Sequence, residues 1–148
     1  MEKIAILLAD DDADDRSFFH QALTESHIPA KLTTVEDGQQ LTHFLSGVAE
    51  PPPPDIIFLD INMPFKNGKS CLLEIRQETK FDSVVVVMYS TSSERKDIDE
   101  TFTYGANMYI IKPASFEAQI NMLKTLFLPG WKERISNSTR EMFVLKAG

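Results

Sequence analysis

DIIFLDINMP, residues 55–64, is the stretch that decides the fold: an apolar run ends at Asp60, and a proline-containing loop follows. Three other apolar runs also end in polar residues. These runs are 4–9 before Asp10-Asp11-Asp12, 84–89 before Ser90-Thr91, and 108–111 before Lys112-Pro113. Continuous apolar runs are typical of strands buried on both faces of a parallel sheet. Because such strands end at one crevice, carboxylates, hydroxyls and an ammonium are expected together there.

Strand-like and helix-like segments alternate along the chain. Strands are expected at residues 3–9, 31–35, 56–59, 84–89 and 107–111, and helices at 13–26, 39–48, 68–79, 93–104 and 115–127. Five β-then-α units in a row predict an α/β fold with a doubly wound, five-stranded parallel sheet. The run Pro51–Pro54 cannot continue a helix and is interpreted as a stiff spacer rather than a ligand for aromatic-groove domains.

Size and composition restrict the function. At 148 residues the chain is expected to form one domain, and its net charge of −7 argues against direct contact with nucleic acid. A single cysteine, Cys71, excludes an intrachain disulfide and is expected to be a core thiol. The N-terminus lacks a signal-peptide layout, and no apolar stretch approaches the length of a membrane span. We therefore expect a cytoplasmic protein without a membrane partner.

Residues 128–148 differ from the body of the chain, residues 1–127. They carry four basic side chains against two acidic ones, whereas the body is strongly acidic. Their apolar residues, among them Trp131 and Phe143, show no clear period. Twenty-one residues are too few for a separate domain, so we expect an extension that packs back on the body. A segment for partner binding or for a homodimer is the alternative.

The polar residues at the strand ends suggest phosphoryl chemistry. The carboxylates of Asp10, Asp11 and Asp60 would repel one another unless a cation neutralised them. Oxygen ligands without histidine or cysteine favour Mg²⁺ over zinc. A carboxylate such as Asp60 can act as a nucleophile toward a phosphoryl group. Lys112 and a hydroxyl from Ser90 or Thr91 would then stabilise the charge on the transferred group.

This set of residues resembles the receiver domain of two-component response regulators, of the stand-alone chemotaxis type. The match covers about residues 3–127. It rests on Asp10-Asp11-Asp12, Asp60-Ile61-Asn62-Met63-Pro64 with Gly68, Ser90-Thr91 and Lys112-Pro113. Each motif alone is weak, but together, in order and each at a strand end, they are specific. The resemblance implies a flavodoxin-like strand order of 2-1-3-4-5.

The resemblance also implies a role for each site residue. Asp60 would be the phosphoacceptor, paired after phosphorylation with Lys112. Mg²⁺ would be held by Asp11 directly, by Asp10 through water, by Asp60 and by the backbone carbonyl of Asn62. Ser90, with Thr91 as the neighbouring candidate, would donate a hydrogen bond to the phosphoryl group, and Tyr109 would be the aromatic switch residue.

Two departures from the family pattern bear on the site. Asp12 is a third acid, so the choice of Asp10 and Asp11 as the metal pair is partly a choice of register. Asp12 could instead cap the first helix, with Asp15 completing a partial capping box. In addition, Phe65-Lys66-Asn67-Gly68 follows Met63-Pro64, where the family usually has a less apolar residue and Asp-Gly.

The function expected from these observations is a response regulator rather than a turnover enzyme. A sensor histidine kinase would phosphorylate Asp60, and the signal would pass to an unknown downstream protein through the fourth helix, fifth strand and fifth helix. A phosphorelay intermediate is one alternative. Another is an Mg²⁺-dependent aspartyl-phosphate phosphatase, although such enzymes usually have an acid at the position of Asn62. A degenerate scaffold is disfavoured by the intact acid set.

Overall fold

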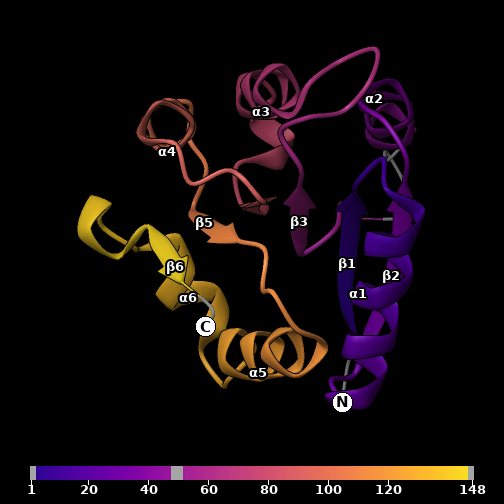
Figure 1. Cartoon of the computed structure of the whole chain (residues 1–148). Coiled ribbons are helices and arrows are strands. Elements are labelled where there is room, and N and C mark those ends of the chain that lie inside the picture. The colour runs from indigo at the N-terminus through magenta and orange to yellow at the C-terminus, as the bar shows by residue number, and fades with distance from the viewer. Residues whose placement is uncertain (1–2, 48–51, 147–148) are drawn as a thin grey trace.

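A parallel sheet with helices on both faces forms the body of the protein in the computed structural model, which describes residues 3–47 and 52–146 (Figure 1). The elements of the body are β1 (Ile4–Ala9), α1 (Ala13–Glu25), β2 (Ala30–Val35), α2 (Gly38–Ser46), β3 (Ile56–Leu59), α3 (Gly68–Gln77), β4 (Val85–Ser90), α4 (Arg95–Thr103), β5 (Met108–Ile111) and α5 (Phe116–Leu126). A short 3₁₀ turn, Thr79–Phe81, follows α3. The predicted alternation is confirmed, and Val48 and Pro51 lie outside the described residues.

The order of the strands is β2-β1-β3-β4-β5-β6, and every neighbouring pair is parallel. This confirms the order predicted for the first five strands. The sixth strand, β6 (Val144–Lys146), comes from the C-terminal extension and was not predicted. Tyr109 in β5 lies opposite Val144 in β6.

Two apolar cores lie on opposite faces of the sheet. One contains side chains of α2 and α3 with part of α4, and the other contains side chains of α1, α5 and α6 (Trp131–Ser136). All residues of β3 and β4 are buried, which explains why these strands read as continuous apolar runs. The rings of Phe19, Phe58 and Tyr89 meet edge to face, with centroids 5.0 to 5.8 Å apart.

The C-terminal extension packs against β5 and α4, beside the end of the sheet (Figure 1). Phe143 is fully buried, with its ring centroid 5.1 Å from that of Phe102 and 6.2 Å from that of Tyr109. The amide of Tyr109 donates to the carbonyl of Phe143 at 2.8 Å, and Arg140 pairs with Asp99 at 2.5 Å. The described part of the extension, residues 128–146, therefore packs back on the body.

Helix starts are set by polar caps that the sequence supplies. Asp12, Asp37, Asn67 and Ser115 each accept a hydrogen bond at the start of a helix from the backbone amide three residues later. The cap at Asp12 begins α1 directly after β1, so Asp10 and Asp11 remain in the short connection between strand and helix. In the described ranges, none of the helices has both the length and the apolar character needed to span a bilayer.

Candidate functional site

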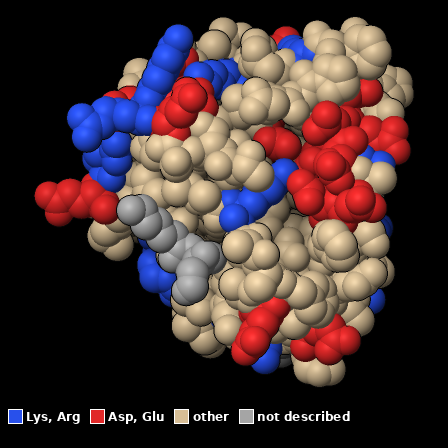
Figure 2. All heavy atoms as spheres, viewed as in Figure 1, with Lys and Arg blue, Asp and Glu red and all other residues tan. Residues whose placement is uncertain are grey.

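The carboxyl ends of β1, β3 and β5 bring three charged side chains together. Asp10 follows β1 and is 1% exposed, and Asp60 follows β3 and is 7% exposed. Lys112 follows β5, and its Nζ lies 2.8 Å from Oδ2 of Asp10 and 3.2 Å from Oδ2 of Asp60. Figure 2 shows acidic side chains gathered around the β1–α1 loop on this face of the molecule. The crevice predicted from the strand ends is therefore present.

Carboxylate oxygens of Asp10, Asp11 and Asp60 all lie within 4.8 Å of one another. This is a spacing that one cation could bridge, and the donor set consists of hard oxygen ligands, which suit Mg²⁺. Asp12 is not part of this group. Its carboxylate caps α1 and accepts from the amide of Asp15 at 3.0 Å. Of the three consecutive acids, the structure thus brings Asp10 and Asp11, and not Asp12, together with Asp60.

Burial and the nearby charge of Lys112 act in opposite directions on the pKa of Asp60. Desolvation raises the pKa of Asp60 above its ordinary value, and the nearby ammonium of Lys112 offsets only part of that effect. For Lys112, burial by itself would lower the pKa, but hydrogen bonds to Asp10 and Asp15 and the charge of Asp60 raise it. Lys112 therefore stays protonated. It lies beside the carboxylate of Asp60, whose ionised form is energetically unfavourable without further positive charge.

The loop after β3 is held in place by its own backbone. The amide of Ile61 donates to Oδ1 of Asp60 at 2.8 Å, and the amide of Gly68 donates to the carbonyl of Ile61 at 2.8 Å. A Cβ at Gly68 would lie 2.0 Å from the carbonyl oxygen of Asp60, so only glycine fits there. Phe65, by contrast, has a left-handed backbone (φ 68°) and is 78% exposed. Asn62 is exposed.

The residues predicted to act as a switch are Ser90, the last residue of β4, and Tyr109, which lies within β5. Ser90 is fully buried, and its Oγ accepts from the amide of Ser92 at 3.1 Å, whereas Thr91 is exposed. Tyr109 is buried, and its hydroxyl donates to the carbonyl of Ser92 at 2.8 Å. Among the described residues, no hydrogen bond joins Ser90 to Asp60. The loop at Ser92 therefore connects both switch candidates.

Asp15 is a site residue that sequence reasoning missed. Its expected role was to complete a capping box, but its carboxylate reaches Nζ of Lys112 instead, at 2.9 Å. The amide of Asp12, which a capping box would have satisfied, donates to Oδ1 of Asp10 at 3.0 Å. No local pattern signals this contact, because Asp11 lies before the cap of α1 and the bond joins residues 97 positions apart.

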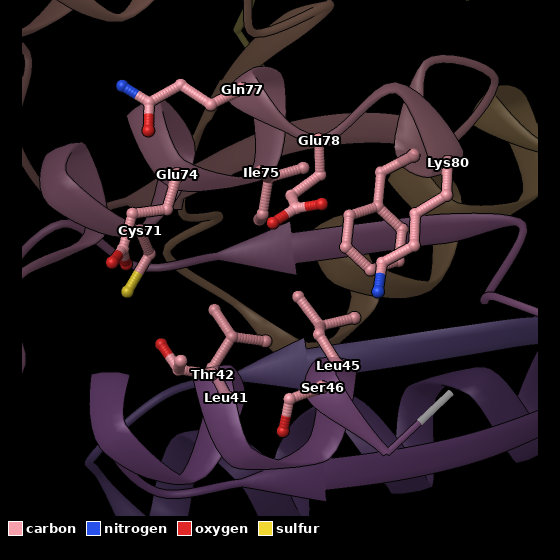
Figure 3. A pocket seen from close by; sticks show the side chains of 11 residues that line it. Leu41, Thr42, Leu45, Ser46, Cys71, Glu74, Ile75, Gln77, Glu78 and Lys80 are labelled. Carbon is pink, nitrogen blue, oxygen red and sulfur yellow. The ribbon is translucent and has the colours of Figure 1, made fainter. Parts of the chain in front are cut away.

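A separate cavity of about 220 Å³ lies between α2 and α3 (Figure 3), and none of Asp10, Asp11 and Asp60 lines it. Leu41 and Leu45 of α2 face Cys71 and Ile75 of α3 across it. Cys71 is 2% exposed, and burial raises the pKa of its thiol. It has the environment of a core thiol, as predicted, because a reactive cysteine needs a lowered pKa and access.

Comparison with known proteins identifies the family. The model of the response regulator receiver domain matches residues 6–124. Response regulator Rcp1 of Synechocystis sp. is 30% identical over 125 residues, which cover 82% of this chain and 84% of Rcp1. Longer relatives match over a part of their length only: the protein-glutamate methylesterase/protein-glutamine glutaminase of Trichodesmium erythraeum is 32% identical, with 36% of it covered.

Solved structures agree with this match. The phosphorylated cyanobacterial phytochrome response regulator RcpA superposes with a TM-score of 0.77 at 31% identity, covering 84% of this chain and 91% of RcpA. The Mn²⁺-bound form of Rcp1 gives a TM-score of 0.76 at 28% identity, covering 88% of this chain and 96% of Rcp1. With its acidic crevice at the ends of β1 and β3 and its lysine at the end of β5, the chain belongs to the response regulator receiver domain family.

Proposed function

We propose that this chain receives a phosphoryl group on Asp60 from a sensor histidine kinase, with Mg²⁺ in the acidic crevice. One observation carries the proposal: Asp60 lies 3.2 Å from the ammonium of Lys112 and within 4.8 Å of the carboxylates of Asp10 and Asp11. A receiver that resembles Rcp1 over most of its length supports the same role. Receivers are signalling proteins, so we do not propose rapid turnover of a substrate.

The chain's own residues can perform the transfer. A carboxylate oxygen of Asp60 attacks phosphorus, the bond between phosphorus and the donor's nitrogen or oxygen breaks, and the donor leaves with that electron pair. When bound, Mg²⁺ neutralises the crowded carboxylates and the phosphoryl oxygens. Asp10 and Asp11 would hold the ion together with Asp60 and the carbonyl of Asn62. Lys112 supplies a fixed positive charge for the oxygens of the transferred group.

The signal is proposed to leave through a protein contact near the switch residues. Ser90, rather than the exposed Thr91, would donate to the phosphoryl group, and the loop at Ser92 would carry the change to Tyr109. In the described structure Phe143 of the C-terminal extension packs its ring against the rings of Tyr109 and Phe102. The downstream protein would therefore meet a surface built from α4, β5 and the extension. We propose that residues 1–127 form the receiver and that 128–148 are an extension of it rather than a domain.

Incubation with a small phosphodonor and Mg²⁺, followed by intact mass, tests the proposal. The wild type is expected to gain one phosphate, and Asp60→Asn is expected to gain none. Asp12→Asn is the matched control, because Asp12 caps α1 and lies outside the group of three acids. A phosphate that persists in Asp60→Asn, or that forms equally well with a chelator, would contradict the proposal. Rapid turnover of a soluble phosphomonoester would favour the phosphatase alternative.

A further inference from the structure

Asp15 contacts Lys112 from the first turn of α1, and this contact has a consequence for the proposed reaction. Nζ of Lys112 lies 2.9 Å from Asp15, nearly as close as its 2.8 Å contact with Asp10 and closer than its 3.2 Å contact with Asp60. We propose that Asp15 is a positioning residue that holds Lys112 toward α1 and competes with the phosphoryl group for its ammonium. This inference rests on the proposed function of Asp60.

The geometry separates Asp15 from the other two partners of Lys112. Asp10 and Asp60 belong to the group of carboxylates that a cation could bridge, and Asp15 does not. Asp15 and Lys112 instead line a cavity of about 350 Å³ between α1 and α5, together with the ring of Tyr89. That ring has its centroid 5.7 Å from Nζ. A cation that engaged Asp10 and Asp60 would therefore leave Asp15 as the carboxylate still available to Lys112.

The position of Asp15 is set by the start of α1. Its backbone amide donates to the cap Asp12 at 3.0 Å. The next residue, Arg16, donates from Nη1 to the carbonyl of Asp10 at 2.8 Å and so ties the first turn of the helix to the crevice. The Asp15 side chain is 39% exposed, whereas that of Lys112 is 11% exposed. Asp15 is thus a partly exposed anion whose position is set by the first turn of α1, and it contacts the largely buried cation of Lys112.

Phosphorylation changes the balance of charge around Lys112. A phosphorylated Asp60, which is an acyl phosphate, would carry phosphoryl oxygens with more negative charge than the free carboxylate. The phosphoryl oxygens would attract Lys112, and movement of its ammonium away from Asp15 would weaken the charge-assisted hydrogen bond between the two side chains. Asp15 therefore stabilises the unphosphorylated arrangement relative to the phosphorylated one. Removing its charge is expected to favour the phosphorylated state.

The test compares Asp15→Asn, Asp15→Glu and Asp14→Asn with the wild type. Rates of phosphate gain from a small phosphodonor with Mg²⁺, and of loss after donor removal, are followed by intact mass. Asp15→Asn is expected to raise the ratio of the two rate constants about two- to fivefold, as fits a partly exposed ion pair. Asp15→Glu is expected to stay close to the wild type, because it keeps the charge. Asp14 is exposed on the same turn, and its side chain makes no hydrogen bond or ion pair with the described residues, so Asp14→Asn is the control.

A second measurement needs no phosphate and separates this inference from the proposed function. Hydrogen exchange of the Lys112 ζ-ammonium is followed by NMR in metal-free protein, and Asp15→Asn is expected to speed it severalfold while Asp14→Asn leaves it unchanged. If the wild type takes no phosphate, the proposed function fails, and the exchange rate alone decides whether Asp15 holds Lys112. An equal rise of the rate-constant ratio in Asp14→Asn and Asp15→Asn would overturn the inference, because the loss of any nearby negative charge would then explain the effect. An unchanged ratio or exchange rate in Asp15→Asn would overturn it outright.

Discussion

The acidic crevice and the C-terminal extension are built on opposite principles. In the crevice, carboxylates are held within 4.8 Å of one another, and burial raises the pKa of Asp60. In the extension, the contacts support each other: Phe143 is fully buried against two aromatic rings, and Arg140 pairs with Asp99. The crevice therefore loses stability by keeping reactive groups together, whereas the extension adds stability, and its described residues contribute no acid to the crevice.

This difference predicts the sign of a substitution's effect. Removing a group from the crevice region is expected to stabilise the metal-free protein, and removing one from the extension is expected to destabilise it. The four tests that follow run from the largest expected change in the free energy of unfolding to the smallest.

Phe143→Ala tests the extension at its centre. Phe143 is 0% exposed, and truncation of a buried phenylalanine costs about 3–5 kcal/mol. Urea denaturation is expected to show this loss in the free energy of unfolding. Met142, the neighbouring residue, is 57% exposed, so Met142→Ala is a control with an expected change below about 0.5 kcal/mol. Equal, small effects of both variants would mean that the extension is only loosely attached, and they would contradict its stabilising role.

Asp60→Asn tests the crevice at its centre. Because burial raises the pKa of Asp60 in the folded state, the ionised carboxylate destabilises the fold at neutral pH. The variant is expected to be more stable than the wild type by about 1 kcal/mol at neutral pH without metal. The gain should shrink as the pH falls through the folded-state pKa, because protonated Asp60 and asparagine are both neutral. Asp14→Asn, which removes an exposed charge, should show no such pH-dependent gain. Denaturation curves at pH 7.5 and 4.5 in chelator measure both effects, and a gain that grows toward acid pH would contradict the assignment.

Phe65→Gly tests whether the crevice loop is strained. A left-handed backbone costs a residue with a side chain about 1–2 kcal/mol, and glycine avoids this cost while losing about 0.5–1 kcal/mol of chain entropy. Since Phe65 is 78% exposed, little burial is lost, and a net gain of about 0.5–1 kcal/mol is expected in the free energy of unfolding. Phe65→Ala keeps the Cβ and should bring no gain. If both variants behave alike in thermal melts, the backbone at this position is not strained.

Arg140→Ala tests the outer contact of the extension. The side chains of Arg140 and Asp99 are 45% and 51% exposed, so their ion pair is expected to contribute less than about 1 kcal/mol. The loss should become smaller at about 1 M salt, where exposed charges are screened. A double-mutant cycle with Asp99→Asn separates the pair from the packing of Arg140 over the rings of Phe102 and Phe143. A salt-independent loss would assign the effect to packing.

The sequence predicted what depends on local pattern. The strands, the meeting of Asp10, Asp11, Asp60 and Lys112, and the cap at Asp12 follow from residues close together in the chain or from the rule that parallel strands end at one edge. The order of the strands was implied by the family resemblance. For these features, periodicity and turn residues carry enough information. Their joint occurrence at four strand ends made the family resemblance specific.

Two features could not be predicted because they depend on distant residues. The strand β6 has three residues and no period of its own, and it is placed by Phe143, whose burial depends on Phe102 and Tyr109. The contact of Asp15 joins residues 97 positions apart. A local rule, the capping box, predicted a different partner for that carboxylate, and the long-range contact with Lys112 prevailed.

The short strand β6 also determines how the sheet ends. Without it, β5 would be the last strand, and the unpaired backbone groups of Met108–Ile111 would be free to join a strand from another molecule. With it, the final strand is only Val144–Lys146, a poor template for such pairing. The extension thus covers the backbone edge of β5, and a chain that ended before β6 would be expected to self-associate more readily than the full chain.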